Sequence, residues 1–382
     1  MSAEVRHFLR PGCRVALADG VGAPASALSL LADAADEVGG VSLLLGWLLN
    51  LDPGLLRASA FREIRALMGG YALRRPIREG NVTYVPARLG SSPALISGPL
   101  RPDVLIASVR PHRGGFAWCS EVSWMACAAE MATTVLGVIN ERLPITSGEP
   151  VLPADRVTVV AEATDPIPQV RQSDPGESAR AIGEAVAALI PAGAAVQVGP
   201  GTIATAVLDA LKSPVRVRSG VIGDAIVDLD ERGLLVDPAE TAYVVGSDRV
   251  YDWANGRAVS RRIEYTHDVR RLSAMPFFAV NTALEIDAYG QVNVERAGDD
   301  PIGGIGGHGD FAFAASRSKN GLSIIALPRQ RAGRSTLLDR LDVPASTAFP
   351  DIDVVVCEVG HIDLRAKSSA ERRAALTDLW SR

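Results

Sequence analysis

The chain has 382 residues, of which 47% are hydrophobic and 22% are charged, and this composition excludes a disordered or collagen-like protein. Acidic residues outnumber basic ones by 44 to 39, giving a net charge of −5. That balance argues against a nucleic-acid partner, because phosphate binding needs a clustered basic face. At about 150 residues per domain, the length favours two or three domains.

The cysteines and the apolar runs bear on the compartment. Four cysteines in a chain of this size are too few for a disulfide framework, and none lies in a CxxC pair or at zinc-finger spacing from a histidine. We therefore expect no metal site. The N-terminus lacks the apolar core of a signal peptide. The longest apolar run, residues 41–51, is shorter than the roughly 20 residues that span a bilayer, so we expect a cytoplasmic protein without a membrane anchor.

The first expected element is a short buried strand within residues 11–22. It ends in a glycine loop and leads into an amphipathic helix over residues 23–31. The same order of turn, strand, glycine loop and helix returns at residues 191–211, with Gly199 and Gly201 in the loop. Such glycines let backbone amides approach a ligand, and the helix N-terminus attracts negative charge. The repeat predicts two related α/β domains.

The boundary between these domains is expected in residues 164–176, which contain three prolines and show no helical or strand period. We therefore predict an N-terminal domain at 1–176 and a C-terminal domain at 177–382, with a helix resuming over 178–190. Short apolar stretches alternate with helix-like segments, which is typical of an α/β fold. The expected strands are Val104–Ser108, Val157–Ala161, Ser323–Ala326 and Val354–Cys357.

The strongest local signal lies towards the C-terminus. Residues 281–293 predict a strand, a turn at Tyr289-Gly290 and a second strand. Residues 303–309 then hold five glycines and lead into a helix over 312–318 and a strand over 323–328. A Walker lysine and the GxGxxG spacing are missing, which disfavours an NTP or dinucleotide site. Dense glycines before a helix still indicate a backbone cradle for an extended ligand.

At these residues the sequence resembles the acetyl-CoA hydrolase/transferase family, which includes 4-hydroxybutyrate and butyrate:acetate CoA-transferases. The resemblance runs through most of the chain. Its most specific blocks are Ala283-Leu-Glu-Ile-Asp287 with Gly290-Gln-Val-Asn293, and the glycine cluster with Ser323-Ile-Ile-Ala-Leu-Pro328. It implies two similar open α/β domains with an acyl-CoA lying between them. It also implies a homodimer or higher homo-oligomer, with coenzyme A as part of the substrate and no other cofactor.

The resemblance also suggests roles for individual residues. Asn281 matches an asparagine that helps to hold the thioester carbonyl, although an asparagine at the start of a strand often only closes a turn. His308 is expected at phosphate or the thioester oxygen, or else facing solvent. We expect a valine at position 307 to block binding while leaving the fold intact. The expected CoA-binding residues are Gly199, Gly201, Gly306, Gly307, His308 and Gly309.

One position departs from the family pattern. In the family a glutamate attacks the thioester and forms a glutamyl-CoA intermediate, which is covalent catalysis in two easier steps. The matching stretch here is Arg218-Ser-Gly-Val-Ile-Gly-Asp-Ala-Ile-Val-Asp-Leu229, and the glutamate position holds Gly220. A glycine cannot be acylated, so the usual transferase mechanism is expected to be absent.

Glu121 is the candidate for a catalytic carboxylate in place of the missing glutamate. It follows Cys119-Ser120 in a turn that resembles one the family keeps near the acyl group. Between Trp118 and Trp124 its carboxyl pKa would rise by desolvation, which suits a general base for water. The alternatives are a surface glutamate and a nucleophilic Cys119 or Ser120. Three functions remain open: acyl-CoA hydrolysis at the thioester or an activated C–C bond, CoA transfer with a misplaced nucleophile, and acyl-CoA binding without catalysis.

Overall fold

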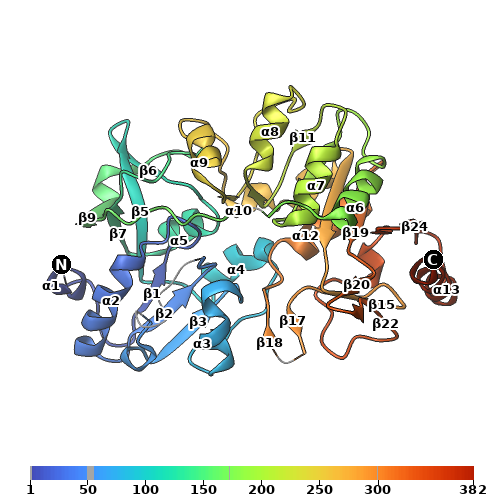
Figure 1. Ribbon diagram of the computed structural model, residues 1–382. Helices are drawn as coiled ribbons and strands as arrows, with labels where there is room; N and C mark the ends of the chain where they lie inside the picture. Colours follow the sequence, from blue (N-terminus) through green and yellow to red (C-terminus); the bar gives the residue numbers. More distant parts are fainter. Residues whose placement is uncertain (1, 50–55, 172, 299) are drawn as a thin grey trace. The chain divides into compact units, whose positions relative to one another are not determined.

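The computed structural model describes residues 2–49, 56–171, 173–298 and 300–382. The chain forms two compact units (Figure 1). The first unit contains Met1–Gln169, Ala242–Glu264 and Asp300–Gly304, and the second contains Val170–Thr241, Tyr265–Asp299 and Ile305–Arg382. Each unit has a main sheet of its own, and the two sheets differ in strand number and pairing.

The break after Gln169 falls within the proline-containing residues 164–176, ahead of the expected boundary at 176/177. The chain also returns to the first unit twice, which a single boundary does not describe. Backbone hydrogen bonds explain the longer return, since the Val122 amide donates to the Ala242 carbonyl and the Val244 amide donates to the Ser120 carbonyl. These pairings hold residues 242–264 in the first unit.

The first unit is built on one sheet of nine strands within the described residues. The strands are β1 (Arg14–Leu17), β2 (Ser42–Leu45), β3 (Glu63–Ala66), β4 (Thr83–Tyr84), β5 (Val104–His112), β6 (Gly115–Trp118), β7 (Thr134–Ile139), β8 (Leu152–Pro153) and β9 (Val157–Glu162). Parallel pairing runs β4-β3-β2-β1-β5 and continues from β5 to β7 and β9. Strands β6 and β8 join by antiparallel pairing, since β6 folds back on the end of β5.

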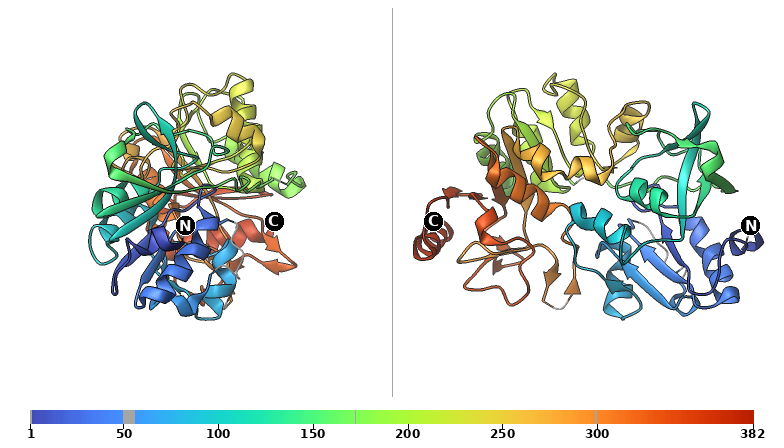
Figure 2. Two further views of the ribbon diagram at one scale, coloured as in Figure 1. Left: turned by 90° about the vertical axis from the view of Figure 1, so that its left-hand side faces the viewer. Right: turned by 180° about the vertical axis from the view of Figure 1, so that it is seen from behind.

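Apolar side chains of α2 (Ala25–Val38) pack against this sheet. Leu28 and Leu31 are fully buried with Val15 and Leu17 of β1, and each such side chain contributes about 1.5–3 kcal/mol of hydrophobic free energy. Helix α2 ends at Val38, and the next residue, Gly39, has φ +74°. The first two helices lie side by side (Figure 2). The helices are α1 (Ser2–Arg6), α2 (Ala25–Val38), α3 (Arg74–Arg78), α4 (Ser92–Ile96), α5 (Met125–Met131) and α9 (Asp248–Ala254).

The second unit is built on a sheet of six strands in the order β11-β10-β14-β19-β23-β24. All pairs are parallel except β23 with β24, and the near-continuous apolar strands are typical of a parallel sheet buried on both faces. The strands are β10 (Ala195–Val198), β11 (Arg216–Val217), β14 (Phe277–Thr282), β19 (Leu322–Ala326), β23 (Val354–Cys357) and β24 (Gly360–Asp363). A small sheet joins β15 (Glu285–Asp287), β16 (Val292–Asn293) and β22 (Leu337–Leu338).

Helices pack on this sheet as the pattern of apolar residues requires. In α12 (His308–Arg317), Phe311 and Ala315 pack against β14. Their partners, Phe277 and Ala279, are two residues apart, so alternate side chains of β14 face this helix. The helices are α6 (Glu177–Ala187), α7 (Thr202–Ala210), α8 (Ala225–Glu231), α11 (Val269–Ser273), α12 (His308–Arg317) and α13 (Ser369–Ser381). The short helix α10 (Ile263–Thr266) precedes α11. Helices α6 and α7 lie side by side (Figure 1).

The predicted α/β class and the predicted strands are confirmed. Strands β5, β9, β19 and β23 cover the four apolar stretches, and the turn at Tyr289-Gly290 closes with the Gly290 amide donating to the Asp287 carbonyl. Helix α12 begins at His308, four residues before the expected start at residue 312. Asp310 in its first turn favours this earlier start, because a carboxylate stabilises a helix N-terminus. In the described part of the chain, no helix is long and apolar enough to cross a membrane.

Candidate functional site

The two glycine turns share one local build but differ in the space around them. Gly20 follows β1 with φ +79°, and Gly201 follows β10 with φ +118°, both in the region that favours glycine. A Cβ at Gly199 or Gly201 would have no atom within 4 Å, whereas a Cβ at Gly20 would lie 2.5 Å from a carboxylate oxygen of Glu121. The first turn is therefore filled by a side chain of the protein, and the second turn has room for a ligand.

Glu121 is buried in the first unit, with 3% of its surface exposed. Its Oε1 accepts a hydrogen bond from the Gly22 amide at 3.0 Å, and its Oε2 accepts one from Ser120 Oγ at 2.8 Å. This geometry excludes the surface alternative considered from the sequence. The carboxyl group ties the first glycine turn to the segment after β6.

A second carboxyl group, Asp19, lies at the same turn and is fully buried. Its Oδ2 accepts hydrogen bonds from the Trp47 amide at 3.2 Å, from Trp124 Nε1 at 2.8 Å and from the Tyr243 hydroxyl at 2.8 Å. Ser123 Oγ donates in turn to the Tyr243 hydroxyl. Trp124, which the sequence placed near Glu121, therefore binds Asp19 instead.

Burial controls the protonation of both carboxyl groups. It raises the pKa of Glu121 to about 8, a shift that Ser120 and the Gly22 amide oppose and that the negative charge of Asp19 increases. It also raises the pKa of Asp19 to about 6, against the hydrogen bonds from Tyr243, Trp47 and Trp124. At neutral pH Glu121 is therefore mostly protonated, and Asp19 is mostly ionised. A carboxyl pKa near neutrality is what a general base or acid requires.

The neighbouring Cys119 thiol is not activated as a nucleophile. Cys119 is buried, and burial raises the pKa of its thiol, which is the opposite of what a reactive thiolate needs. Ser120 Oγ donates its hydrogen to Glu121. Within the described residues, no group of three or more histidine, cysteine, aspartate or glutamate side chains is placed to hold a metal ion.

In the second unit, Gly220 lies in the loop after β11. A Cβ at this position would lie 3.2 Å from Cε2 of Phe311 and 3.4 Å from Nε2 of His267. These aromatic side chains hold the space that a side chain at position 220 would enter. His267 was not identified from the sequence, because it lies in Tyr265-Thr-His-Asp268, without glycines or a spacing that marks a site.

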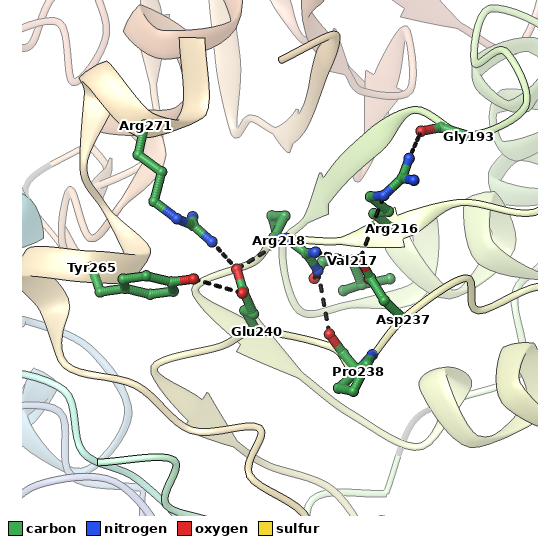
Figure 3. Close-up of polar contacts among 9 residues, drawn as sticks. All are labelled: Gly193, Arg216, Val217, Arg218, Asp237, Pro238, Glu240, Tyr265 and Arg271. Atoms are coloured by element: carbon green, nitrogen blue, oxygen red, sulfur yellow. Dashed lines mark hydrogen bonds and ion pairs between the residues drawn. The ribbon is translucent and has the colours of Figure 1, made fainter. Parts of the chain in front are cut away.

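An ion-pair cluster fixes the segments that carry Gly220 and His267 (Figure 3). Glu240 binds Arg218 Nε at 2.9 Å and also pairs with Arg271, and Tyr265 donates its hydroxyl to Glu240 at 2.8 Å. Arg218 precedes Gly220 by two residues, whereas Tyr265 and Arg271 flank His267. The Arg271 guanidinium also lies 3.8 Å from the centre of the Tyr265 ring. Glu240 thereby holds both segments together.

The glycine cluster is more closely packed than the sequence indicated. A Cβ at Gly307 would collide with His267 Nε2 and would lie 2.6 Å from Phe311. The expectation that Gly307→Val leaves the fold intact is therefore wrong, because the space belongs to two buried rings. Gly306 has φ +56°, and Gly309 is buried in the first turn of α12.

His308 and Asn281 lie in the second unit near the start of α12. His308 Nδ1 lies 2.7 Å from Thr347 Oγ1, and burial lowers the pKa of His308 to about 4, so its ring is neutral at pH 7. Asn281 is 4% exposed near the carboxyl end of β14. Its Nδ2 has no hydrogen-bond partner in the described part of the chain. A buried amide donor without a partner is available to a ligand oxygen, which suits the predicted oxyanion role.

Adding a methyl group at Gly307 tests the packing of the cluster. We expect Gly307→Ala to lower stability by about 1–3 kcal/mol, because the new Cβ displaces His267 and Phe311 from their positions. Thermal unfolding measures the change. Gly199→Ala is the matched control and should leave the melting temperature nearly unchanged, since its Cβ meets open space. Equal melting temperatures for both variants would contradict the packing described here.

Comparison with known proteins gives a family-model match for the C-terminal part of the chain. Residues 246–379 match the family model described as the acetyl-CoA hydrolase/transferase C-terminal domain. This segment includes Asn281 and the glycine cluster but begins after Glu121 and Gly220.

Relatives extend the similarity beyond that segment. The chain is 28% identical over 392 residues to 4-hydroxybutyrate coenzyme A transferase of Clostridium kluyveri, covering 96% of this chain and 90% of the relative. It is 27% identical over 374 residues to acetyl-CoA hydrolase of Candida albicans, covering 87% and 63%. The crystal structure of RipA from Yersinia pestis has the same fold, with a TM-score of 0.89 at 24% identity over 99% of this chain and 93% of that chain. Residues 246–379 thus match the acetyl-CoA hydrolase/transferase C-terminal domain, and most of the chain is similar to a CoA-transferase and an acetyl-CoA hydrolase.

Proposed function

We propose that this enzyme of the acyl-CoA hydrolase and CoA-transferase type hydrolyses an acyl-CoA, at the thioester or at an activated C–C bond, without a glutamyl-CoA intermediate. The observation that carries the proposal is Gly220. It stands where the family resemblance expects the nucleophilic glutamate, and the atoms nearest to the place of its Cβ belong to Phe311 and His267. Neither ring can form the mixed anhydride that the transferase reaction requires, and we assign the attack to water.

For a thioester, the proposed step is direct attack by water. The water oxygen bonds to the carbonyl carbon while a base takes one proton from water. The C–S bond then breaks, and coenzyme A leaves as a thiolate that takes this proton back from the base. The products are a carboxylic acid and free coenzyme A. The carbonyl oxygen carries negative charge during this step, and a buried donor such as Asn281 Nδ2 stabilises it.

The other predicted residues are part of the same proposal. Glu121 is proposed as the group that takes the proton from water, on the strength of a pKa raised to about 8. Gly199 and Gly201 are proposed to bind coenzyme A, because a Cβ on either would meet no atom within 4 Å. Gly306, Gly307, His308 and Gly309 are proposed for the same ligand, with coenzyme A as part of the substrate.

CoA transfer to a carboxylate acceptor is the second candidate. It is favoured by the names of two relatives, the 4-hydroxybutyrate coenzyme A transferase and the butyryl-CoA:acetate CoA-transferase of Anaerostipes caccae, which is 26% identical over 349 residues. That reaction requires a carboxylate nucleophile in place of Gly220.

Release of free thiol and trapping of intermediates separate these functions. We expect the pure protein to release thiol from at least one member of an acyl-CoA panel without any carboxylate acceptor. After exposure to that acyl-CoA, borohydride or hydroxylamine should reveal no glutamyl-CoA adduct by mass spectrometry. An adduct on any glutamate, together with exchange that depends on an acceptor, would establish the transferase instead. Tight binding of every acyl-CoA without turnover would reject both reactions.

A further inference from the structure

His267 has a buried nitrogen that the mechanism above does not use. The residue lies between α10 and α11 and is 4% exposed. Its Nδ1 lies 2.9 Å from Thr266 Oγ1, whereas its Nε2 has no hydrogen-bond partner among the described residues. A buried polar atom without a partner lowers stability, so its presence calls for an explanation in terms of a ligand or a water.

Two of the residues next to His267 Nε2 are glycines, which have no side chain. Gly220 and Gly307 come from separate loops, and a Cβ on either one would contact Nε2. The Phe311 ring packs against the imidazole, with ring centres 4.5 Å apart. Gly307 lies directly against Nε2, and the neighbouring Gly306 has φ +56°, in the region that favours glycine.

The ring is held in both position and charge. Glu240 binds Arg218 near Gly220 and Tyr265 and Arg271 on either side of His267, so the two segments are anchored to each other (Figure 3). Burial lowers the pKa of His267 to about 3, so the ring is neutral across the physiological range. A neutral imidazole carries one proton, and Nε2 carries it when the Thr266 hydroxyl donates to Nδ1.

We propose that His267 is a catalytic residue whose Nε2–H donates a hydrogen bond to the carbonyl oxygen of the bound acyl-CoA. The proposal rests on the hydrolase function proposed above. As water adds to the carbonyl carbon, the oxygen gains negative charge and the bond from Nε2 strengthens. When the C–S bond breaks, the carbonyl re-forms and the negative charge moves from its oxygen to the departing sulfur. The imidazole keeps its proton throughout, so it acts as a fixed donor and not as a base.

Two substitutions separate this role from simple packing. His267→Phe keeps a ring against Phe311 but removes the donor, and we expect kcat/KM to fall about a hundredfold. His267→Gln keeps an amide donor and should recover at least a tenth of the wild-type value. The phenylalanine variant loses the contact between Nδ1 and Thr266 Oγ1, so it should melt slightly lower than wild type but remain folded, because Nε2 has no protein partner to lose. Full activity in the folded His267→Phe variant would overturn the proposal.

A binding measurement makes the test independent of turnover. The probe is a ketone analogue of acetyl-CoA in which a methylene replaces the sulfur, compared with free coenzyme A by calorimetry. His267→Phe should weaken binding of the ketone about tenfold and leave binding of coenzyme A unchanged. Equal effects on both ligands, or none, would mean that Nε2 does not contact the carbonyl. If His267→Phe weakens only ketone binding but the wild-type protein releases no thiol from any acyl-CoA, the hydrolase function is rejected and the contact with the carbonyl stands.

Discussion

Glu121→Gln is expected to reduce acyl-CoA hydrolysis at least a hundredfold with little change in KM. Glutamine keeps the size of the side chain, and its amide can accept from the Gly22 amide and donate to Ser120 Oγ. It lacks the basicity, and a positioned base contributes about 10²- to 10⁴-fold to rate. Steady-state kinetics on the best substrate of the panel gives the measurement. The matched control is Glu37→Gln, an exposed glutamate paired with Arg6, which should keep wild-type rates.

The pH dependence of the same variant tells a base from a residue that only anchors the glycine turn. The folded-state pKa of Glu121 is raised from 4.5 to about 8, so the folded protein holds a proton that the unfolded chain releases above about pH 4.5. Stability from this group is therefore full at low pH and is lost as pH rises towards 8. Glu121→Gln should flatten that decline. Flattening without any loss of activity would assign Glu121 to the turn alone.

In the wild-type enzyme, a base with this pKa also predicts that hydrolysis accelerates as pH increases through about 8, because only the ionised carboxylate accepts a proton. His267 would not cause a rise in rate near pH 8, since burial lowers its pKa to about 3.

Local patterns were sufficient for the elements that carry the fold. The stretch before Gly199 forms β10 and the residues after Gly201 form α7, because a short apolar run, a glycine turn and an amphipathic run each determine structure within a few residues. The same holds for β1 and the helix that follows it. The resemblance at Ala283–Asp287 and at the glycine cluster likewise agrees with the family-model match over residues 246–379.

Contacts between distant residues account for what the sequence did not predict. Asp19 and Tyr243 are hydrogen-bonded although they are 224 positions apart, and no local pattern joins them. Nothing in the sequence indicated that the carboxyl group of Glu121 fills the space beside Gly22. His267 could not be predicted as a site residue, because only the folded chain brings it next to Gly220 and Gly307.

Glu240→Ala is expected to cause the largest loss of stability, about 3 kcal/mol, at the lower end of the range for breaking a buried ion pair. The substitution removes the partner of both Arg218 and Arg271 and the acceptor of the Tyr265 hydroxyl (Figure 3). The Glu240 side chain is only 17% exposed, so water replaces these contacts poorly. Arg218 retains Asp237 at 2.7 Å, which limits the loss. Urea denaturation followed by circular dichroism gives the free energy of unfolding.

Asp237→Ala is the matched control, because it removes another acidic partner of Arg218 from a more exposed place. The Asp237 side chain is 33% exposed, and a pair of that kind contributes at most about 1 kcal/mol. The two variants should also differ in activity. Only the loss of Glu240 frees the segments that hold Gly220 and His267, so kcat should fall in Glu240→Ala under conditions where both proteins are fully folded. Equal stability and equal kcat in the two variants would show that Glu240 does not position these residues.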